Sequence, residues 1–508
     1  MILFFTRGRG ENILNKKIDK KIDKKVHILG ISGTFMAGIA SIARQMGYEV
    51  TGSDQHCYPP MSTYLESLGI EISEGFSEEA IKYLDQKEQD PDNTEIIIGN
   101  VMRRGMPVIE EMLSRKMDLI SGPEWLENKI LKHRWVLCVS GTHGKTTTAS
   151  MLAWILEFAG FNPGFLIGGL PENFGVSARY TESDFFVIEG DEYDTSFFDK
   201  RSKFIHYKPS TLIINNLELD HIDIFDDLKM IQRQFHHLLK IIPKEGLIIY
   251  PENINTREIS EVLSWGCYSE QEKIGDKNNF WAEVNNFNNL DIFYKEKLVG
   301  EIIWDLLGQH NINNALSAIA AAHHVGVQPE VAVKALCEFK GVKRRMELKG
   351  EVNDIYIFDD FAHHPTAIHT TLEGLKNRLK NNKNNIKSGR LIAVFEPRSN
   401  TLKSGFQKEL LARSFGLADQ VFLYQGPGVK WDIKKTFELE NISAQVFLEI
   451  EDLILNLKNN LKPGDHVLIM SNGGFENIHE RLLMALRSAP LCPSDESEVL
   501  PLPLGERR

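Results

Sequence analysis

The stretch that decides the fold is Ser140-Gly141-Thr142-His143-Gly144-Lys145-Thr146-Thr147-Thr148. It follows an apolar run at 135–139 and opens an apolar-periodic segment at 149–159, so it predicts a strand, a glycine turn and a helix. This layout wraps backbone N–H groups around a phosphate. Lys145 then supplies a positive charge for phosphate oxygens, and the Thr146 hydroxyl is a ligand for Mg²⁺. We therefore expect a phosphate-binding loop rather than an ordinary loop rich in glycine and threonine.

Length and composition set the broad class. A chain of 508 residues is too long for one core and suggests about three domains. A net charge of −12 does not indicate binding to nucleic acid or to an anionic membrane. No apolar run reaches about 18 residues, so no membrane span is expected. The five cysteines form no C-x-x-C pair, which favours a reducing cytoplasm over a disulfide framework.

The first domain is expected at 26–133, after a Lys-rich N-terminal extension at 1–25. A short apolar strand at 26–29 leads into a glycine turn and a helix, and a second strand at 48–54 ends in Asp54. Strand, glycine turn, helix and a later acid form the dinucleotide-fold arrangement. The glycine spacing is not the usual G-x-G-x-x-G, so this signal is weak by itself.

The central domain is expected at 134–340 and begins with the phosphate loop. Apolar runs at 185–189 and 211–216 are typical of buried parallel strands, and each ends in polar residues. Ligand groups of open α/β sheets gather at such strand ends. A helix at 311–324 is expected to close the domain, with short strands and loops at 253–299.

The C-terminal domain is expected at 341–487, followed by a Pro-rich, acidic tail at 488–508. Apolar strands at 355–360, 391–395 and 467–470 alternate with helical stretches. The Asn/Lys-rich run at 376–387 is interpreted as a solvated loop. The predicted fold is therefore α/β, with Rossmann-like first and third domains around a central P-loop ATPase domain whose sheet is mostly parallel.

Three strand ends in the central domain, carrying Lys145-Thr146, Glu189 and His221, predict one Mg²⁺-nucleotide site. Two alternatives remain open for the neighbouring residues. His221 is a less typical magnesium ligand and can instead bond a strand end. The nearby acids can be solvated rather than ligating: Asp191, Glu192, Asp194 and Asp220.

Taken together, the motifs resemble the Mur ligase family, whose short G-x-x-G-K-[ST] loop explains why Val139 replaces the usual first glycine. Residues 189–194 and 216–221 resemble the family's acidic and histidine metal motifs. Three further motifs match in order: His310-Asn311-Ile312-Asn313-Asn314-Ala315, Gly341-Val342-Lys343-Arg344-Arg345-Met346-Glu347 and Asp359-Asp360-Phe361-Ala362-His363-His364-Pro365. The resemblance spans residues 26 to about 485.

The resemblance implies an ATP-driven amide ligase that uses Mg²⁺ and accepts UDP-N-acetylmuramate. Its carboxylate would attack the γ-phosphate of ATP, and an amine would then attack the acyl phosphate. The stretches at 58–63, 197–204, 395–401 and 470–475 are similar to the branch that adds the murein tripeptide L-Ala-γ-D-Glu-meso-diaminopimelate in peptidoglycan recycling. Three alternatives are the L-alanine-adding ligase of de novo synthesis, a folylpolyglutamate synthetase-type ligase and a non-catalytic nucleotide-sensing protein.

The resemblance also implies a role for each matched residue. Catalysis would involve Lys145, His221 and Arg345, and metal binding Thr146, Glu189 and His221. The nucleotide would contact Gly141, Thr142, His143, Gly144, Lys145, Thr146, Thr147, His310, Asn311, Asn314 and Asp360. The substrates would contact Gly30, Gly33, Gly38, Asp54, His363, His364 and Arg398, although an ordinary surface ion pair is an equal alternative for Arg398. A cytoplasmic monomer or weak homo-oligomer is expected, with no nucleic acid or membrane partner.

Small departures from the family pattern lie in and near these motifs. Ser32, Ala37 and Gly190 stand where the family has cysteine, glycine and alanine. The methyl group of Ala37 is expected to crowd the loop that binds the UDP group.

Overall fold

The computed structural model describes residues 24–57, 61–76, 78–220, 222, 224–252, 256–285, 289–304, 308–380 and 389–488. The chain forms two compact units, Met1–Lys343 and Arg344–Arg508, and each is described by itself. The first unit holds one parallel sheet, one mostly parallel sheet, their helices and a small antiparallel sheet, and the second holds one further sheet. None of the helices in the described ranges is long and apolar enough to cross a membrane.

The N-terminal sheet is parallel throughout, with the order β3-β2-β1-β4-β5. Its strands are β1 (Lys25–Leu29), β2 (Glu49–Asp54), β3 (Glu71–Glu74), β4 (Thr94–Ile98) and β5 (Ile120–Ser121). The helices are α1 (Thr34–Gln45), α2 (Met61–Ser67), α3 (Glu78–Gln89), α4 (Pro107–Ser114) and α5 (Gly122–Lys129), and a 3₁₀ turn, η2 (Leu131–His133), follows. The run from Met36 to Ala43 in α1 is entirely buried, which holds the helix against its neighbours. The predicted strand–turn–helix–strand arrangement is confirmed.

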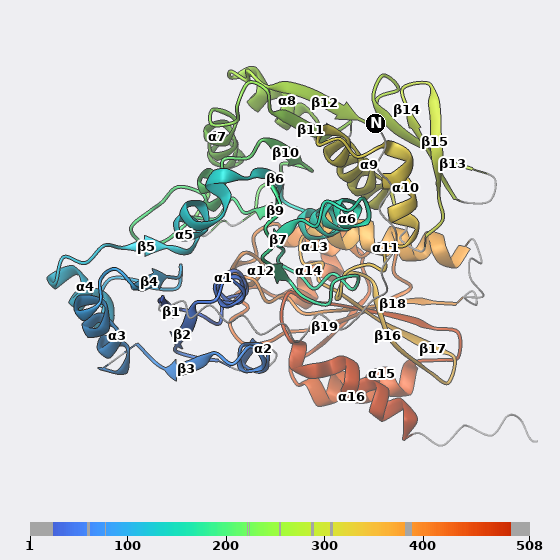
Figure 1. Cartoon of the computed structure of the whole chain (residues 1–508). Helices are drawn as coiled ribbons and strands as arrows, with labels where there is room; N and C mark the ends of the chain where they lie inside the picture. Colours follow the sequence, from blue (N-terminus) through green and yellow to red (C-terminus); the bar gives the residue numbers. More distant parts are fainter. Residues whose placement is uncertain are drawn as a thin grey trace, which may run out of the picture. The chain divides into compact units, whose positions relative to one another are not determined.

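The central sheet has the order β12-β11-β10-β6-β9-β7-β8, and only β8 is antiparallel to its neighbour. Its strands are β6 (Trp135–Ser140), β7 (Gly164–Leu166), β8 (Ala178–Arg179), β9 (Phe185–Gly190), β10 (Thr211–Ile214), β11 (Leu247–Pro251) and β12 (Glu270–Ile274). The elements around it are α6 (Lys145–Phe158), η3 (Lys203–His206), α7 (Leu228–Leu239), α8 (Thr256–Ser264), α9 (Gln309–His324) and α10 (Pro329–Cys337). Helix α6 is buried on nearly every side because α9 and α10 pack against it (Figure 1).

A small antiparallel sheet follows, made of β13 (Phe280–Val284), β14 (Leu290–Tyr294) and β15 (Lys297–Ile302). The strands predicted for 253–299 are therefore present, but residues 256–264 form helix α8, which the sequence analysis did not predict. Ile259, Val262 and Leu263 recur at helical spacing and are buried, so they fix α8 against the core. The Asn-rich sequence around the helix obscured this short pattern.

The second unit is built on a sheet of order β16-β17-β21-β18-β19-β20, in which only β16 pairs in antiparallel fashion. Its strands are β16 (Glu347–Val352), β17 (Ile355–Asp360), β18 (Leu391–Phe395), β19 (Gln420–Tyr424), β20 (Ala444–Phe447) and β21 (His466–Met470). Its helices are α11 (Pro365–Lys380), α12 (Asn400–Ser404), α13 (Lys408–Ser414), α14 (Ile433–Leu439), α15 (Ile450–Asn460) and α16 (Ile478–Arg487), and a 3₁₀ turn, η5 (Phe475–Asn477), precedes α16.

The predicted loop at 376–387 is wrong over its first part, because α11 continues to Lys380. Leu375 and Leu379 are buried one turn apart on the inner face of this helix. Their burial outweighs the polar composition of the run, so the helix continues through residues that look like a loop in the sequence. Residues 381–388 lie outside the described part of the chain.

Candidate nucleotide and substrate site

The phosphate loop lies between the end of β6 and the start of α6, as predicted. Gly141 and Gly144 have φ of 119° and 79°, a backbone region that side chains disfavour. A Cβ on Gly141 would lie 2.9 Å from the backbone nitrogen of Asn216, and one on Gly144 would lie 2.7 Å from Oδ1 of Asn314. Both glycines are therefore required by conformation and by space.

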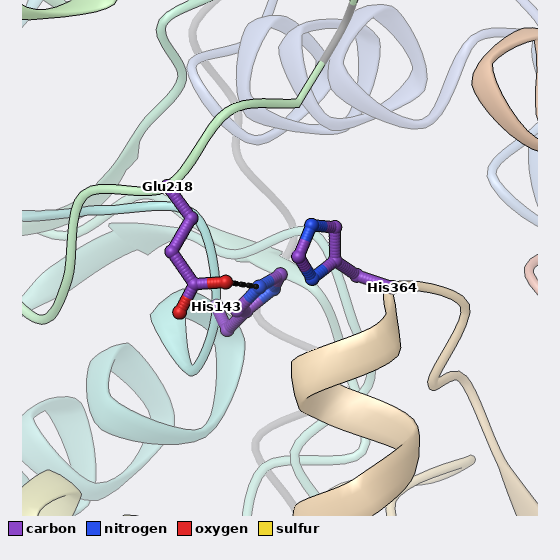
Figure 2. Close-up of side chains that lie close together, drawn as sticks. All are labelled: His143, Glu218 and His364. Atoms are coloured by element: carbon purple, nitrogen blue, oxygen red, sulfur yellow. Dashed lines mark ion pairs between the residues drawn. The ribbon is translucent and has the colours of Figure 1, made fainter. Parts of the chain in front are cut away.

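Polar residues just beyond β10 hold this loop in place. The backbone N–H of His143 donates to Oδ1 of Asn216 at 2.8 Å, and Nδ2 of Asn215 donates to the carbonyl of His143 at 3.2 Å. The backbone N–H of Glu218 donates to Oγ1 of Thr142 at 2.9 Å. Figure 2 shows the Glu218 carboxylate directed at the His143 ring, with Oε2 and Nε2 3.5 Å apart. Asn215, Asn216 and Glu218 had no predicted role of their own, although the Asn pair directly after a buried strand was a signal.

Lys145 is the first residue of α6, and its side chain is held by two acceptors. Its Nζ donates to the carbonyl of Gly141 at 2.6 Å and lies 3.3 Å from Oε2 of Glu192. Burial opposes the charge, but the carboxylates of Glu192, Asp191 and Glu189 outweigh it and raise the pKa of Lys145. Glu192 is only 2% exposed. The alternative of a solvated acid is therefore wrong for Glu192.

Thr146 and Glu189 lie side by side because β6 and β9 are neighbours in the sheet. Oγ1 of Thr146 donates to Oε2 of Glu189 at 3.3 Å, while Oε1 accepts the backbone N–H of Gly168 at 2.6 Å. A hydroxyl and a carboxylate are hard oxygen donors, so the pair fits the ligand preference of Mg²⁺. Asp220, another acid of the proposed site, is buried, so the solvated alternative is wrong for it too. His221, the other predicted metal ligand, lies outside the described residues.

The predicted adenine motif starts α9 and lies beside the phosphate loop. Asn311 and Asn314 are buried, and Nδ2 of Asn314 donates to Oδ1 of Asn311 at 3.3 Å. Asn314 also borders Gly144, so the structure brings this motif and the phosphate loop together. Burial lowers the pKa of His310 to about 4, which keeps its ring neutral near pH 7.

In the N-terminal sheet, the glycine turn and Asp54 meet at the carboxyl ends of β1 and β2. Gly30 has a φ of 79°, and Gly33 is the residue that caps α1. Oδ2 of Asp54 accepts the backbone N–H of Ser32 at 2.8 Å, so the predicted acid fixes the turn directly. The structure therefore places Gly30, Gly33 and Asp54 together at one end of the sheet.

Gly38 lies one turn further along, inside α1. A Cβ there would be 2.2 Å from Cδ1 of Leu166, so close packing of α1 against β7 accounts for this glycine. Ala37 beside it is also buried, and its methyl group packs in the hydrophobic core.

In the second unit, the two arginines of the linker motif have different surroundings. Nη2 of Arg344 donates to the carbonyls of Ser471 and Gly473, each at 2.8 Å, and its Nε donates to the Asp359 carboxylate at 3.2 Å. Arg344 is thus bound to its own unit by three contacts. Arg345 is the residue that the resemblance assigns to the nucleotide, and both arginines lie over the Phe361 ring.

Asp360 fixes the backbone around Arg345. Its two carboxylate oxygens accept the backbone N–H groups of Met346 and Ala362, each at 2.8 Å. Burial raises the pKa of Asp360, although Arg345 and the two N–H groups oppose the shift. The Arg345 guanidinium lies 5.0 Å from the centre of the Phe361 ring. Asp360 and Arg345, both predicted for the nucleotide, therefore lie close together.

His363 and His364 lie at the start of α11. Nδ1 of His363 is 3.0 Å from the carbonyl of Phe361, within hydrogen-bonding distance. The carbonyl of His364 accepts the backbone N–H of Ile368, which makes His364 the residue that begins the helix. Nδ1 of His364 also accepts the backbone N–H of Thr366 at 3.3 Å, so this side chain has a structural role at the start of the helix.

Arg398 and Glu396 lie just after β18. Their side chains are 3.8 Å apart, and Oε2 of Glu396 accepts the Ser471 hydroxyl at 2.7 Å. A Cβ on Gly473 would lie 2.2 Å from Cδ of Arg398, so the arginine stem rests on the Gly473 backbone. The Arg398 side chain is 49% exposed, so its guanidinium is accessible from solvent despite this ion pair.

A second acid, Glu476, follows β21, the strand next to β18. The Tyr424 hydroxyl donates to Oε1 of Glu476 at 2.9 Å, and burial together with this bond raises the pKa of Tyr424 to about 12. Phe475, Glu476 and Asn477 all have positive φ, from 43° to 56°, which is a strained turn for side-chain-bearing residues. The sequence analysis did not identify Glu476 or Tyr424.

Comparisons with known proteins cover almost the whole chain. Residues 25–134 match the model "Mur ligase family, catalytic domain", residues 139–322 match "Mur ligase middle domain", and residues 344–473 match "Mur ligase, glutamate ligase domain". The chain is 50% identical over 465 residues to the UDP-N-acetylmuramate–L-alanyl-γ-D-glutamyl-meso-2,6-diaminoheptandioate ligase of Escherichia coli K12, covering 91% of this chain and 98% of that protein.

Two further comparisons give the similarity to a solved structure and to a ligase named for L-alanine. A crystal structure of a murein peptide ligase from Psychrobacter arcticus 273-4 is 43% identical, with a TM-score of 0.68 over 92% of this chain and 100% of that chain. The UDP-N-acetylmuramate–L-alanine ligase of Dictyoglomus turgidum is 31% identical over 483 residues, covering 90% of this chain and 96% of that protein. On this evidence, the chain belongs to the Mur ligase family and has its α/β, three-domain architecture.

Proposed function

We propose that this ligase joins UDP-N-acetylmuramate to the tripeptide L-Ala-γ-D-Glu-meso-diaminopimelate at the expense of ATP, in peptidoglycan recycling. The observation that carries the proposal is 50% identity to the E. coli ligase named for that tripeptide, against 31% to the ligase named for L-alanine. The stretches at 197–204, 395–401 and 470–475, similar to the tripeptide branch, point the same way. A cytoplasmic monomer or weak homo-oligomer is part of the proposal, and so are the domain bounds predicted from the sequence.

ATP would bind at the phosphate loop. The backbone N–H groups of residues 141–147 would surround its phosphates. The Lys145 ammonium, which lies beside Glu192 in the structure, would then pair with β- and γ-phosphate oxygens instead. Asn311 and Asn314 would contact the adenine beside this loop, and His310 is neutral there. Thr146, Glu189 and His221 would hold Mg²⁺, which supplies positive charge that offsets the repulsion between carboxylate and phosphate.

The chemistry would run in two steps. The lactyl carboxylate oxygen of the UDP-sugar attacks the γ-phosphorus, which releases ADP and leaves an acyl phosphate. The α-amine of the tripeptide then attacks the acyl carbon, and phosphate leaves as the amide forms. Lys145 and Arg345 would stabilise the charge that develops during phosphoryl transfer, which is mainly a matter of position and electrostatics.

The N-terminal sheet would hold the UDP group. The turn from Gly30 to Gly33 presents the N-terminus of the twelve-residue helix α1, where backbone N–H groups and the helix dipole favour a diphosphate. Asp54 would keep this turn in shape through its bond to Ser32. Gly38 would act indirectly, by letting α1 approach β7.

The second unit would supply the peptide site. Arg345 and Asp360 would reach the nucleotide, and His363 and His364 would lie in the substrate region. Arg398 would pair with a peptide carboxylate through its planar guanidinium. Glu476, 52% exposed at the same edge of the sheet, offers the opposite charge. Opposite charges at one edge of the sheet would suit the distal end of meso-diaminopimelate, which carries both an ammonium and a carboxylate.

The test is ADP release with ATP, Mg²⁺ and UDP-N-acetylmuramate in the presence of either L-alanine or the tripeptide. Release should require the tripeptide, and mass spectrometry should detect the UDP-N-acetylmuramoyl tripeptide. ADP release with L-alanine alone would instead assign the chain to the alanine-adding reaction. A nucleotide sensor would release no ADP that depends on both substrates.

A further inference from the structure

The segment between β9 and β10 extends from the central sheet to the helices of the N-terminal sheet. Phe197 and Phe198 pack against the apolar cluster that contains Val108 and Met112 of α4. Thr195 holds the two ends of residues 195–201 together, because its N–H and its hydroxyl both donate to the carbonyl of Arg201, at 3.0 and 2.8 Å. We call residues 193–207 the bridging segment.

Charged groups attach the C-terminal end of the bridging segment to helix α5, which follows the last strand of the N-terminal sheet. His206 is only 3% exposed, and its two ring nitrogens lie 3.0 Å from Oδ2 of Asp199 and 3.3 Å from Oε2 of Glu127. Lys208 also pairs with Glu127. Burial opposes ionisation of Asp199, but hydrogen bonds from Arg201 and His206 lower its pKa to about 2. The segment is thus attached to both sheets.

Lys203 lies at the centre of this attachment, and the proposed mechanism does not use it. It is 8% exposed, and its Nζ donates to Oδ2 of Asp191, 2.6 Å away. The same ammonium lies 5.9 Å from the centre of the Phe35 ring and 5.6 Å from that of Tyr193. Lysine is almost never this buried unless it is paired. Lys203 therefore connects an acid of the 189–192 motif with the first turn of α1.

We infer that Lys203 is a positioning residue that sets the distance between the glycine turn at 30–33 and the acid motif at 189–192. The inference rests on the proposed function, in which the first loop holds the UDP-sugar and the second serves ATP. Each substrate has its own loop, so the two sites can be intact and yet misaligned. Reacting atoms must lie about 3–3.5 Å apart, and a displacement of about 1 Å can cost on the order of 100-fold in rate.

On the side of the central sheet, further hydrogen bonds hold Asp191 and Lys203 in place. Oδ1 of Asp191 accepts the backbone N–H of Tyr193 at 3.2 Å, while the backbone N–H of Lys203 donates to the carbonyl of Tyr193 at 3.0 Å. The Lys203 ammonium thus completes a set of hydrogen bonds that links Asp191, Tyr193 and Lys203. On the N-terminal side, Phe35 lies in the first turn of α1, two residues after Gly33, so the ring contact links the ammonium to the helix that the glycine turn begins.

The test compares Lys203→Met and Lys203→Gln with Lys200→Met, a matched change in the same segment. Lys200 is exposed and pairs with Asp194 at 2.6 Å. Calorimetry gives Kd for UDP-N-acetylmuramate and for ATP separately, ADP release gives kcat, and thermal unfolding checks that each variant folds. Both Lys203 variants should lower kcat at least about tenfold, with both Kd values within about threefold of the parent protein. Lys200→Met should leave kcat unchanged, and Lys203→Arg, which keeps the charge, should recover most of the lost rate.

Two results would overturn the inference. The first is a kcat for both Lys203 variants equal to that of Lys200→Met. The second is a Kd for UDP-N-acetylmuramate weakened tenfold or more in the Lys203 variants, which would make Lys203 a direct contact of the sugar nucleotide. A parent protein that releases no ADP with the tripeptide would instead contradict the proposed function, so the two failures are distinguishable.

Discussion

The Lys145 side chain has two defined partners. Its ammonium lies between the Gly141 carbonyl and the buried Glu192 carboxylate, and three nearby acids keep it charged. A phosphate bound in the proposed loop would therefore meet a cation already in place, which would lower the cost of ordering the side chain on binding. The same carboxylate competes with phosphate for Lys145, so Glu192 is expected to influence nucleotide affinity.

Replacing this lysine tests the loop assignment. Lys145→Ala should lower kcat for ADP release by about 100- to 1000-fold, because the charge on the transferring phosphoryl group loses a preorganised cation. The Kd for UDP-N-acetylmuramate should stay within about twofold, since the proposed sugar-nucleotide turn belongs to another sheet. Lys244→Ala, at an exposed position of the same unit, serves as the control. Full turnover in Lys145→Ala would rule out the phosphate-loop role.

Sequence alone could predict those site residues that belong to a local pattern. Gly141, Gly144, Lys145 and Thr146 follow from one strand–turn–helix motif, and the structure has that motif. Glu192 reaches Lys145 across 47 positions of sequence, and Asn216 reaches His143 across 73. Such contacts depend on which strands become neighbours, and neither spacing nor residue type gives that order.

At the scale of elements, the strands were easier to predict than the helix bounds. Buried parallel strands such as β6, β9 and β10 are continuous apolar runs, so the sequence marks them clearly. Helices α8 and the end of α11 lie in Asn-rich sequence and are fixed by a few apolar contacts in the folded chain. Tertiary packing, which overrides local propensity, accounts for both errors.

The edge strand β12 carries an acid that couples stability to pH. Burial raises the pKa of Glu272 to about 7, and Lys295 opposes this only in part. Within the described part of the chain, its buried Oε1 has no hydrogen-bond partner. The folded state thus holds a proton that the unfolded state releases near pH 4.5, so the free energy of unfolding falls as pH rises from about 4.5 to 7.

Glu272→Gln should remove this dependence. Relative to the parent protein, the variant should gain about 1–3 kcal/mol in free energy of unfolding between pH 5 and pH 8. Urea unfolding at several pH values measures the difference. Glu270→Gln, an exposed position on the same strand, should show no such gain. A constant difference between Glu272→Gln and the parent protein across this range would contradict the assigned pKa.

Across the whole molecule, the candidate residues follow one rule of α/β architecture. Asp54, Glu189 and Asp360 each lie at the carboxyl end of a parallel strand, one in each large sheet. The chain passes from the first unit to the second between Lys343 and Arg344. The backbone N–H of Lys343 donates to the carbonyl of Leu170 in the first unit, and the Arg344 side chain is hydrogen-bonded within the second unit. The order of domains was predictable from the ordered motifs, while the Lys203 and His206 contacts of the bridging segment were not.

The most direct test of the account is a competition between the two acceptors. The protein is supplied with ATP, Mg²⁺, limiting UDP-N-acetylmuramate, and L-alanine and L-Ala-γ-D-Glu-meso-diaminopimelate at equal concentrations, and the products are separated by mass. The UDP-N-acetylmuramoyl tripeptide should be the dominant product. A dominant UDP-N-acetylmuramoyl-L-alanine product would contradict the proposed function.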